Sequence, residues 1–140
     1  MVSGSESRLV GVPVNTAVVR GSAVTLQCSS DVRGSRIFWY DSLCVSSFSF
    51  DCGPNDLIYN PAYGLASSVD SRRFRVTSVN DGGYVLRDLN INPVQPTDAG
   101  VYLCVEIVGA QVTSVGSAQL IVLGMTITYR GSKHITVNHN

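Results

Sequence analysis

Residues 1–124 contain no lysine and no histidine, because Lys133, His134 and His139 all lie near the end of the chain. Catalytic acids, bases and nucleophiles depend heavily on such residues, so their absence argues against an enzyme. Charged residues are only 14% of the sequence, and ten basic residues balance ten acidic ones. No basic field is available for a nucleic-acid backbone or an anionic membrane. We therefore expect no catalytic residues, no metal site, no cofactor and no nucleic-acid partner.

Long apolar segments are also missing. Residues 1–7 have no apolar core of the kind found in signal peptides, and the apolar run at 120–123 is too short to cross a bilayer. Four cysteines without metal-ligand spacing nevertheless indicate disulfides formed in an oxidising compartment. We therefore expect an extracellular location, as a secreted protein or the ectodomain of a membrane protein, with no membrane segment in this chain.

Short strands separated by turns are what the sequence does contain, and helical periodicity is weak throughout. Alternation of apolar and polar residues predicts strands over residues 10–19, 22–29, 36–41, 57–60, 74–78, 84–91, 100–108 and 111–123. Asn80-Asp81-Gly82-Gly83 predicts a tight turn because these residues accept a positive φ at little cost. Gly109-Ala110 predicts a second hairpin. Many short strands without helices are typical of a two-sheet sandwich.

The alternation also assigns the two sides of the central strands. If Cys104 points into the core, its neighbour Leu103 points outward. If Trp39 points inward, Phe38 and Tyr40 point outward. Strands with large apolar residues on both sides are usually covered on both sides. The outward side of these strands is therefore expected to contact something.

A family resemblance follows from the spacing of three features. Cys28, Trp39 eleven residues later, and Asp98-Ala99-Gly100-Val101-Tyr102-Leu103-Cys104 resemble the signature of immunoglobulin variable-type (V-set) domains. Leu57-Ile58-Tyr59 and Arg73-Phe74 are similar to the C′ and D strands of such domains. The resemblance implies an all-β, antiparallel, two-sheet V-type sandwich with Greek-key connections over residues 8–124. Residues 1–7 are then a flexible N-terminus, and 125–140 a tail, a linker or vector-derived residues.

The resemblance also implies scaffold roles for five residues. Cys28 and Cys104 would form a disulfide between the sheets behind Trp39, which stabilises by about 4–5 kcal/mol on the chain-entropy model. Tyr102 would form the tyrosine corner. By analogy with V-set domains, Arg73 and Asp98 would pair at the bottom of the sandwich. None of these roles is a binding site.

Cys44 and Cys52 lie in a segment that is longer than in antibody light chains. Their Cys-x7-Cys spacing resembles the additional C–C′ disulfide of the polymeric immunoglobulin receptor and related innate receptors, although there the first cysteine directly follows the tryptophan. We expect a Cys44–Cys52 disulfide that stabilises by about 2–3 kcal/mol. Phe48 and Phe50, inside the loop it closes, are either a rigid contact for a ligand or a lid packed on the neighbouring sheet.

The last strand departs from antibody chains in a second way. Antibody joining segments have Phe-Gly-x-Gly-Thr before this strand, whereas this chain has Ser114-Val115-Gly116-Ser117-Ala118. The glycine bulge that helps antibody chains pair is absent from the sequence. The resemblance therefore does not imply an antibody-like pair of domains.

A candidate interface lies on the outward side of the sheet expected from residues 36–41, 57–60, 100–108 and 111–123, which corresponds to the GFCC′ sheet of V-set domains. A contiguous apolar face of this kind usually marks an interface. The alternative is that the long C–C′ loop folds back over it. Together with the two phenylalanines of that loop, the candidates are Phe38, Tyr40, Tyr59, Leu103, Val105, Ile107, Phe48 and Phe50.

The sequence therefore predicts an extracellular recognition module of an immune-type receptor or secreted defence protein. It would bind a protein or microbial ligand through the GFCC′ face and the loops at 30–36, 60–70 and 108–114. The alternative is an adhesion domain that homodimerises through the same face, so that its partner is a second copy. Binding of a microbial carbohydrate would need a polar groove with aromatic stacking.

Overall fold

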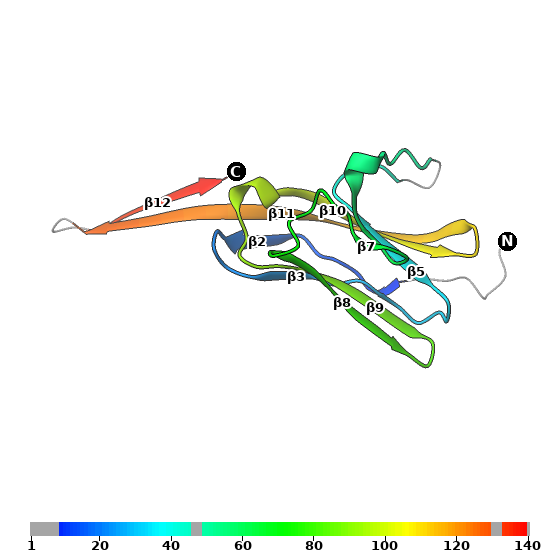
Figure 1. Ribbon diagram of the computed structural model, residues 1–140. Helices are drawn as coiled ribbons and strands as arrows, with labels where there is room; N and C mark the ends of the chain where they lie inside the picture. The colour runs from blue at the N-terminus through cyan, green and yellow to red at the C-terminus, as the bar shows by residue number, and fades with distance from the viewer. Residues whose placement is uncertain (1–8, 46–48, 130–132, 140) are drawn as a thin grey trace.

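The computed structural model describes residues 9–45, 49–129 and 133–139. Within these residues the strands form two sheets that enclose an apolar core (Figure 1). The first sheet has the order β1-β4-β9-β3, and β8 pairs with β9. Its strands are β1 (Leu9–Gly11), β3 (Val24–Leu26), β4 (Ser29–Ser30), β8 (Phe74–Asp81) and β9 (Tyr84–Ile91).

The second sheet has the order β12-β11-β10-β5-β6-β7, and β2 pairs in parallel with β11. Its strands are β2 (Thr16–Val19), β5 (Arg36–Tyr40), β6 (Leu57–Asn60), β7 (Gly64–Leu65), β10 (Gly100–Val108), β11 (Gln111–Tyr129) and β12 (Lys133–His139). Two short 3-10 helices, η1 (Pro54–Asp56) and η2 (Pro96–Asp98), precede β6 and β10. The predicted all-β sandwich is confirmed.

The core lies between the sheets and is built from the inward residues of both. Trp39, Cys28 and Cys104 are fully buried at its centre. The other fully buried apolar side chains of this core are Leu26, Ile37, Leu89, Ile91, Val94, Leu120 and Val122. Removing such side chains from water stabilises the fold by roughly 1.5–3 kcal/mol each.

Several local predictions agree with the structure. The strands at 57–60, 84–91 and 100–108 have the predicted bounds. Gly82 and Gly83 form the turn between β8 and β9 with φ values of 58° and 104°. Gly109, with φ 64°, turns the chain from β10 into β11. Both turns need positive φ, which explains why glycine occupies them.

Two predicted strands are divided in the structure. Residues 10–19 give β1 in the first sheet and β2 in the second. Pro13 lies between them, and because it has no N–H it favours a break in the ladder. Residues 22–29 give β3 and β4, and between them the Cys28 N–H donates to Asp88 Oδ1 at 3.0 Å.

The final strand is longer than predicted. β11 continues to Tyr129 and pairs with β12, from Leu123 opposite His139 to Tyr129 opposite Lys133. In Figure 1 this hairpin, coloured orange to red, extends beyond the sandwich. Strand β11 therefore continues past residue 124, where the sequence analysis placed the end of the domain. That domain boundary stays a prediction.

Candidate functional site

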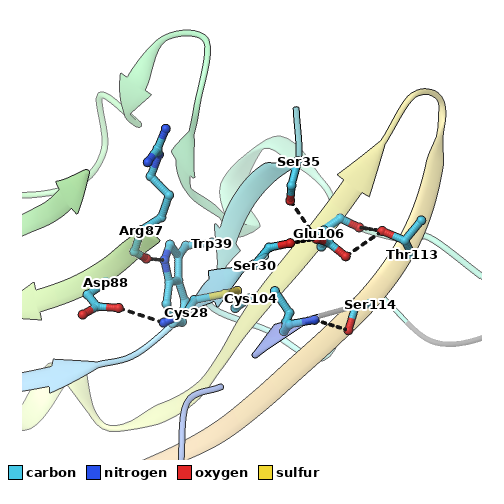
Figure 2. The surroundings of a disulfide bond; sticks show 11 residues. Cys28, Ser30, Ser35, Trp39, Arg87, Asp88, Cys104, Glu106, Thr113 and Ser114 are labelled. Atoms are coloured by element: carbon cyan, nitrogen blue, oxygen red, sulfur yellow. Dashed lines mark hydrogen bonds between the residues drawn. A yellow bond between two sulfur atoms is a disulfide. The ribbon is translucent and has the colours of Figure 1, made fainter. Parts of the chain in front are cut away.

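The two sheets are joined at the centre of the core by the expected disulfide, Cys28–Cys104, with a Cα–Cα distance of 6.5 Å. Trp39 packs beside it, and its Nε1 donates to the carbonyl oxygen of Arg87 at 2.7 Å (Figure 2). The only polar atom of the buried indole ring is thus satisfied. These residues hold β5, β9 and β10 in fixed positions.

The start of β10 carries the second part of the scaffold. Arg73 donates to both carboxylate oxygens of Asp98, at 2.6 and 3.0 Å, and this contact raises the pKa of the guanidinium. The Tyr102 hydroxyl donates to the carbonyl oxygen of Asp98 at 2.6 Å, which is the expected tyrosine corner. Burial raises the pKa of Tyr102. The contacts implied for these three residues are present.

The outer face is the side of β5, β10 and β11 that points away from the core. The strand register sets its rows: Phe38 lies opposite Val105, and Val105 lies opposite Val115. One row further along, Ile107 lies opposite Val112. We define the outer face by its apolar residues, Phe38, Tyr40, Leu103, Val105, Ile107, Val112 and Val115.

Much of the outer face is covered by the chain itself. Cys44 and Cys52 form the second expected disulfide, and Cys44 and Val45 pack with Tyr40, Leu103 and Val105 in a cluster separate from the core. Leu103 is 1% exposed and Val105 is 0% exposed. The rings of Tyr40 and Phe50 pack edge to face, with their centroids 5.8 Å apart. Burial raises the pKa of the Tyr40 hydroxyl. The loop thus folds back over the face, which was the alternative considered from the sequence.

Tyr59 does not lie on the outer face as expected. It pairs with Trp39 and packs in the main core, whereas Leu57 pairs with Tyr40 and packs in the outer cluster. The register shifts between Trp39 and Tyr40, so β6 contains a bulge at this point. A bulge of one residue moves each following side chain to the other side of the sheet, which simple alternation cannot anticipate.

The remaining apolar residues of the face stay accessible. Val112 and Val115 on β11 are each 39% exposed, and Phe50 is 48% exposed. Phe38 and Ile107 are half-buried, and Phe38 is stacked on Tyr40 at 6.3 Å. Phe48 lies outside the described residues. The accessible surface is therefore formed by Val112 and Val115 on β11, with half-buried Ile107 on β10 and Phe38 on β5.

Glu106 is a functional candidate that the sequence analysis missed. Its side chain is 0% exposed and points between the sheets, near the end of β10 (Figure 2). Oε2 accepts hydrogen bonds from Ser30 Oγ and from Ser35 Oγ, the latter at 2.8 Å. Oε1 accepts one from Thr113 Oγ1 at 2.9 Å. The alternation contained the signal, because Glu106 is two residues beyond the inward Cys104 and is the only charge in β10.

These contacts join two of the predicted binding loops. Ser30 and Ser35 flank the turn at 31–34, and Thr113 follows the hairpin at 109–110. Outside the core, Arg36 Nη2 donates to the carbonyl oxygen of Gly109 at 2.9 Å. The third loop, at 60–70, begins at the β6–β7 turn, where Tyr63 is 89% exposed.

Metal-binding clusters are not found in the described part of the chain. Within residues 9–45, 49–129 and 133–139, no three histidine, cysteine or acidic side chains gather at metal-binding distance. Asp56 Oδ2 accepts from the Gly53 N–H at 2.8 Å, which is an ordinary turn contact. None of the helices in those residues is long and apolar enough to cross a membrane.

Comparison with known families identifies this sandwich. Residues 11–123 match the model of the immunoglobulin V-set domain. The chain belongs to the immunoglobulin V-set family. This V-set domain is 28% identical over 102 residues to human T cell receptor alpha variable 36/delta variable 7, a match that covers 71% of this chain and 80% of the relative.

Two solved structures share the fold of this chain. The crystal structure of the RIG-5 IG1 homodimer superposes with a TM-score of 0.63 and 13% identity, over 84% of this chain and 98% of that one. The crystal structure of Rst D1-D2 superposes with a TM-score of 0.58 and 20% identity, over 89% of this chain and 54% of that one. At these identities the likeness describes the fold alone.

Proposed function

We propose that this V-set domain is the extracellular recognition module of an immune-type receptor or secreted defence protein. It binds a protein or microbial ligand through the loops at 30–36, 60–70 and 108–114 and the accessible part of the outer face. The observation that carries the proposal is at the end of the sandwich where these loops lie. There Glu106 joins two of the loops by hydrogen bonds, beside exposed Val112 and Val115. Preorganised loops bind at a lower entropic cost.

The relatives and the disulfides support the immune-type and extracellular parts of this proposal. The family consists of recognition domains, so the proposal gives this chain no catalytic role. The curated relative is a T cell receptor variable segment. Two disulfides and no free cysteine among the described residues fit an oxidising compartment.

Antibody-like pairing is not part of the proposal. Tyr40 and Leu103, two of the candidate interface residues, are buried under the Cys44–Cys52 loop. The segment Ser114–Ala118 pairs regularly with β10, with Gly116 opposite Cys104. A Cβ at Gly116 would lie 3.0 Å from Pro13 Cδ, so this glycine fits the close passage of the N-terminal segment.

A second candidate is a homodimeric adhesion domain. The exposed valines of β11 favour it, because apolar side chains on a sheet face are common in self-association. One of the structural neighbours is a homodimer. The covered half of the outer face argues for recognition of a different molecule, since only the β11 side remains available to a second copy.

The solution mass of the full chain separates the two candidates. Sedimentation equilibrium is measured for the wild type, for Val115→Arg on the outer face and for Val79→Arg as a matched control on the other sheet. The two valines are 39% and 41% exposed, so both substitutions are tolerated to a similar degree. A monomer in all three supports recognition of a different molecule. A dimer that only Val115→Arg dissociates replaces the recognition proposal with adhesion.

Binding is then tested directly with labelled tetramers of the full chain on panels of animal and bacterial cells. We expect staining of particular cells that Val112→Arg abolishes and Val19→Arg preserves. These valines are 39% and 37% exposed, and only the first lies at the loop end. Staining that both variants retain would contradict the proposed surface.

A further inference from the structure

Glu106 is a buried carboxylate without a cationic partner in the described part of the chain. The ion pairs found there join Arg72 and Arg73 to Asp70 and Asp98, at the opposite end of β10. Burying a carboxylate is costly unless its lone pairs are satisfied. Hydroxyl donors meet both oxygens of Glu106. The arrangement is complete in hydrogen bonds but contains no countercharge.

The donors come from segments that are far apart in the sequence. Ser30 is the last residue of β4 in the first sheet, and Ser35 directly precedes β5 in the second. Thr113 belongs to β11, and its Oγ1 also lies within hydrogen-bond distance, 3.3 Å, of the carbonyl oxygen of Glu106. One side chain therefore reaches both ends of the turn at 31–34 and the base of the hairpin at 109–110.

The backbone of the loop at 30–36 is also bonded to the Ser30 hydroxyl that donates to Glu106. The Val32 N–H donates to Ser30 Oγ at 3.1 Å, and the Ser35 N–H donates to the carbonyl oxygen of Val32 at 3.1 Å. Ser30 Oγ thus links the carboxylate to the turn itself. The turn contains Gly34 with φ 80°, a conformation that glycine adopts at little steric cost.

We propose that Glu106 is a positioning residue that sets the relative placement of the loops at 30–36 and 108–114. This inference deepens the proposed function, because it names the residue that preorganises the recognition loops. The carboxylate suits this task because it accepts several hydrogen bonds at once and donates none. Hydrogen bonds to a charged group are also stronger than those between neutral groups. An apolar residue at 106 would fill the same space and remove the buried hydrogen bonds between the loops, while the exposed contact from Arg36 Nη2 to the carbonyl oxygen of Gly109 would remain.

Hydrogen–deuterium exchange of the full chain without ligand tests the inference. We expect Glu106→Leu to accelerate amide exchange in both 31–35 and 108–114 by roughly tenfold, while strands β3, β5 and β9 keep wild-type rates. Glu106→Gln retains one carbonyl acceptor and should accelerate both loops less. Thr113→Val should affect only the hairpin, and Ser35→Ala only the first loop. Thr25→Val is the matched control for Thr113→Val. It removes a threonine hydroxyl that donates to Asn90 Oδ1 within the first sheet, away from Glu106.

Three results would overturn the inference. Unchanged exchange in both loops for Glu106→Leu would show that other contacts hold them. A response of one loop alone would show that Glu106 does not join the two, and an even rise over the whole chain would show a general loss of stability. If Glu106→Leu fails to fold, unchanged loop exchange in both Ser35→Ala and Thr113→Val overturns it equally. No ligand enters the measurement, so its failure is distinct from failure of the proposed function.

Discussion

Two buried carboxylates at opposite ends of β10 are held in different ways. Asp98 is paired with the Arg73 guanidinium through two hydrogen bonds and also accepts from the Gln95 N–H at 2.7 Å. Glu106 is held by hydroxyl groups alone. The first carboxylate has a full countercharge beside it, and the second has none among the described residues.

The difference corresponds to what each carboxylate joins. The Arg73–Asp98 pair connects the start of β8 to the start of β10 and stands beside the tyrosine corner, so it belongs to the scaffold of the fold. Glu106 connects two loops that the sandwich does not need for its core. A buried charge without a countercharge contributes little to stability. We infer that Asp98 maintains the fold and that Glu106 maintains the geometry of the loops.

The largest expected effect is at Asp98. Asp98→Ala removes the two shortest side-chain contacts of Arg73 and leaves its 3.4 Å ion pair with Asp70, so we expect a loss of about 2–3 kcal/mol in the free energy of unfolding. Urea denaturation of the full chain measures it. Asp81→Ala, at an exposed aspartate of the β8–β9 turn, is the control and should change little. A loss of less than about 1 kcal/mol for Asp98→Ala would contradict the inference that Asp98 maintains the fold whereas Glu106 does not.

Tyr102→Phe is expected to have an intermediate effect at the same end. It removes one hydroxyl that donates to a buried carbonyl oxygen, which costs about 1 kcal/mol. Thermal and urea unfolding should both detect the change. Tyr63→Phe removes a hydroxyl from an 89% exposed ring and should be neutral. Equal effects of the two substitutions would contradict a structural role for the corner.

Glu106→Leu is expected to have a smaller effect on stability than either. Glu106→Leu removes the cost of burying a carboxylate, which offsets the loss of the hydrogen bonds from three hydroxyls, so the free energy of unfolding should stay within about 1 kcal/mol of the wild type. The measurement is the same urea titration. A loss as large as that of Asp98→Ala would assign Glu106 to the scaffold.

The smallest effect concerns pH at the Arg73 end. The Arg72 N–H and then the charges of Arg72 and Arg73 lower the pKa of Asp70 below its ordinary 3.8. The ionised carboxylate is therefore favoured in the folded state, and its stabilisation is present above pH 3.8 and lost as pH falls through the lowered value. Asp70→Asn should be slightly less stable than the wild type at neutral pH. The difference in unfolding free energy should vanish in acid, and a difference that grows in acid would reverse the sign.

Sequence reasoning predicted the scaffold well because each of its features is local or sets a fixed spacing. The spacing of Cys28, Trp39 and Cys104 carried the resemblance to V-set domains, and that resemblance implied the disulfide at the centre of the core. The glycine turns were predicted from residues that accept a positive φ. The outer face was harder. Whether Phe50 contacts a ligand or covers Tyr40 depends on how a long loop folds, and residue spacing carries no information about that.

Two other features depended on the register between strands. Tyr59 was assigned to the wrong side because a bulge in β6 reverses the alternation. Glu106 was overlooked because a charge in a strand is ordinarily taken to face solvent, although its separation from Cys104 places it inside. The serines and threonine that satisfy it come from three separate segments, so only the folded structure brings them together.

The most direct test compares Asp98→Ala and Glu106→Leu in one native-state hydrogen-exchange experiment on the full chain. The account predicts that Asp98→Ala accelerates exchange throughout the core strands because global unfolding becomes easier. It predicts that Glu106→Leu leaves the core unchanged and accelerates only the loops at 31–35 and 108–114. The same global acceleration in both variants, with no local change at the loops, would contradict the separation of fold from recognition.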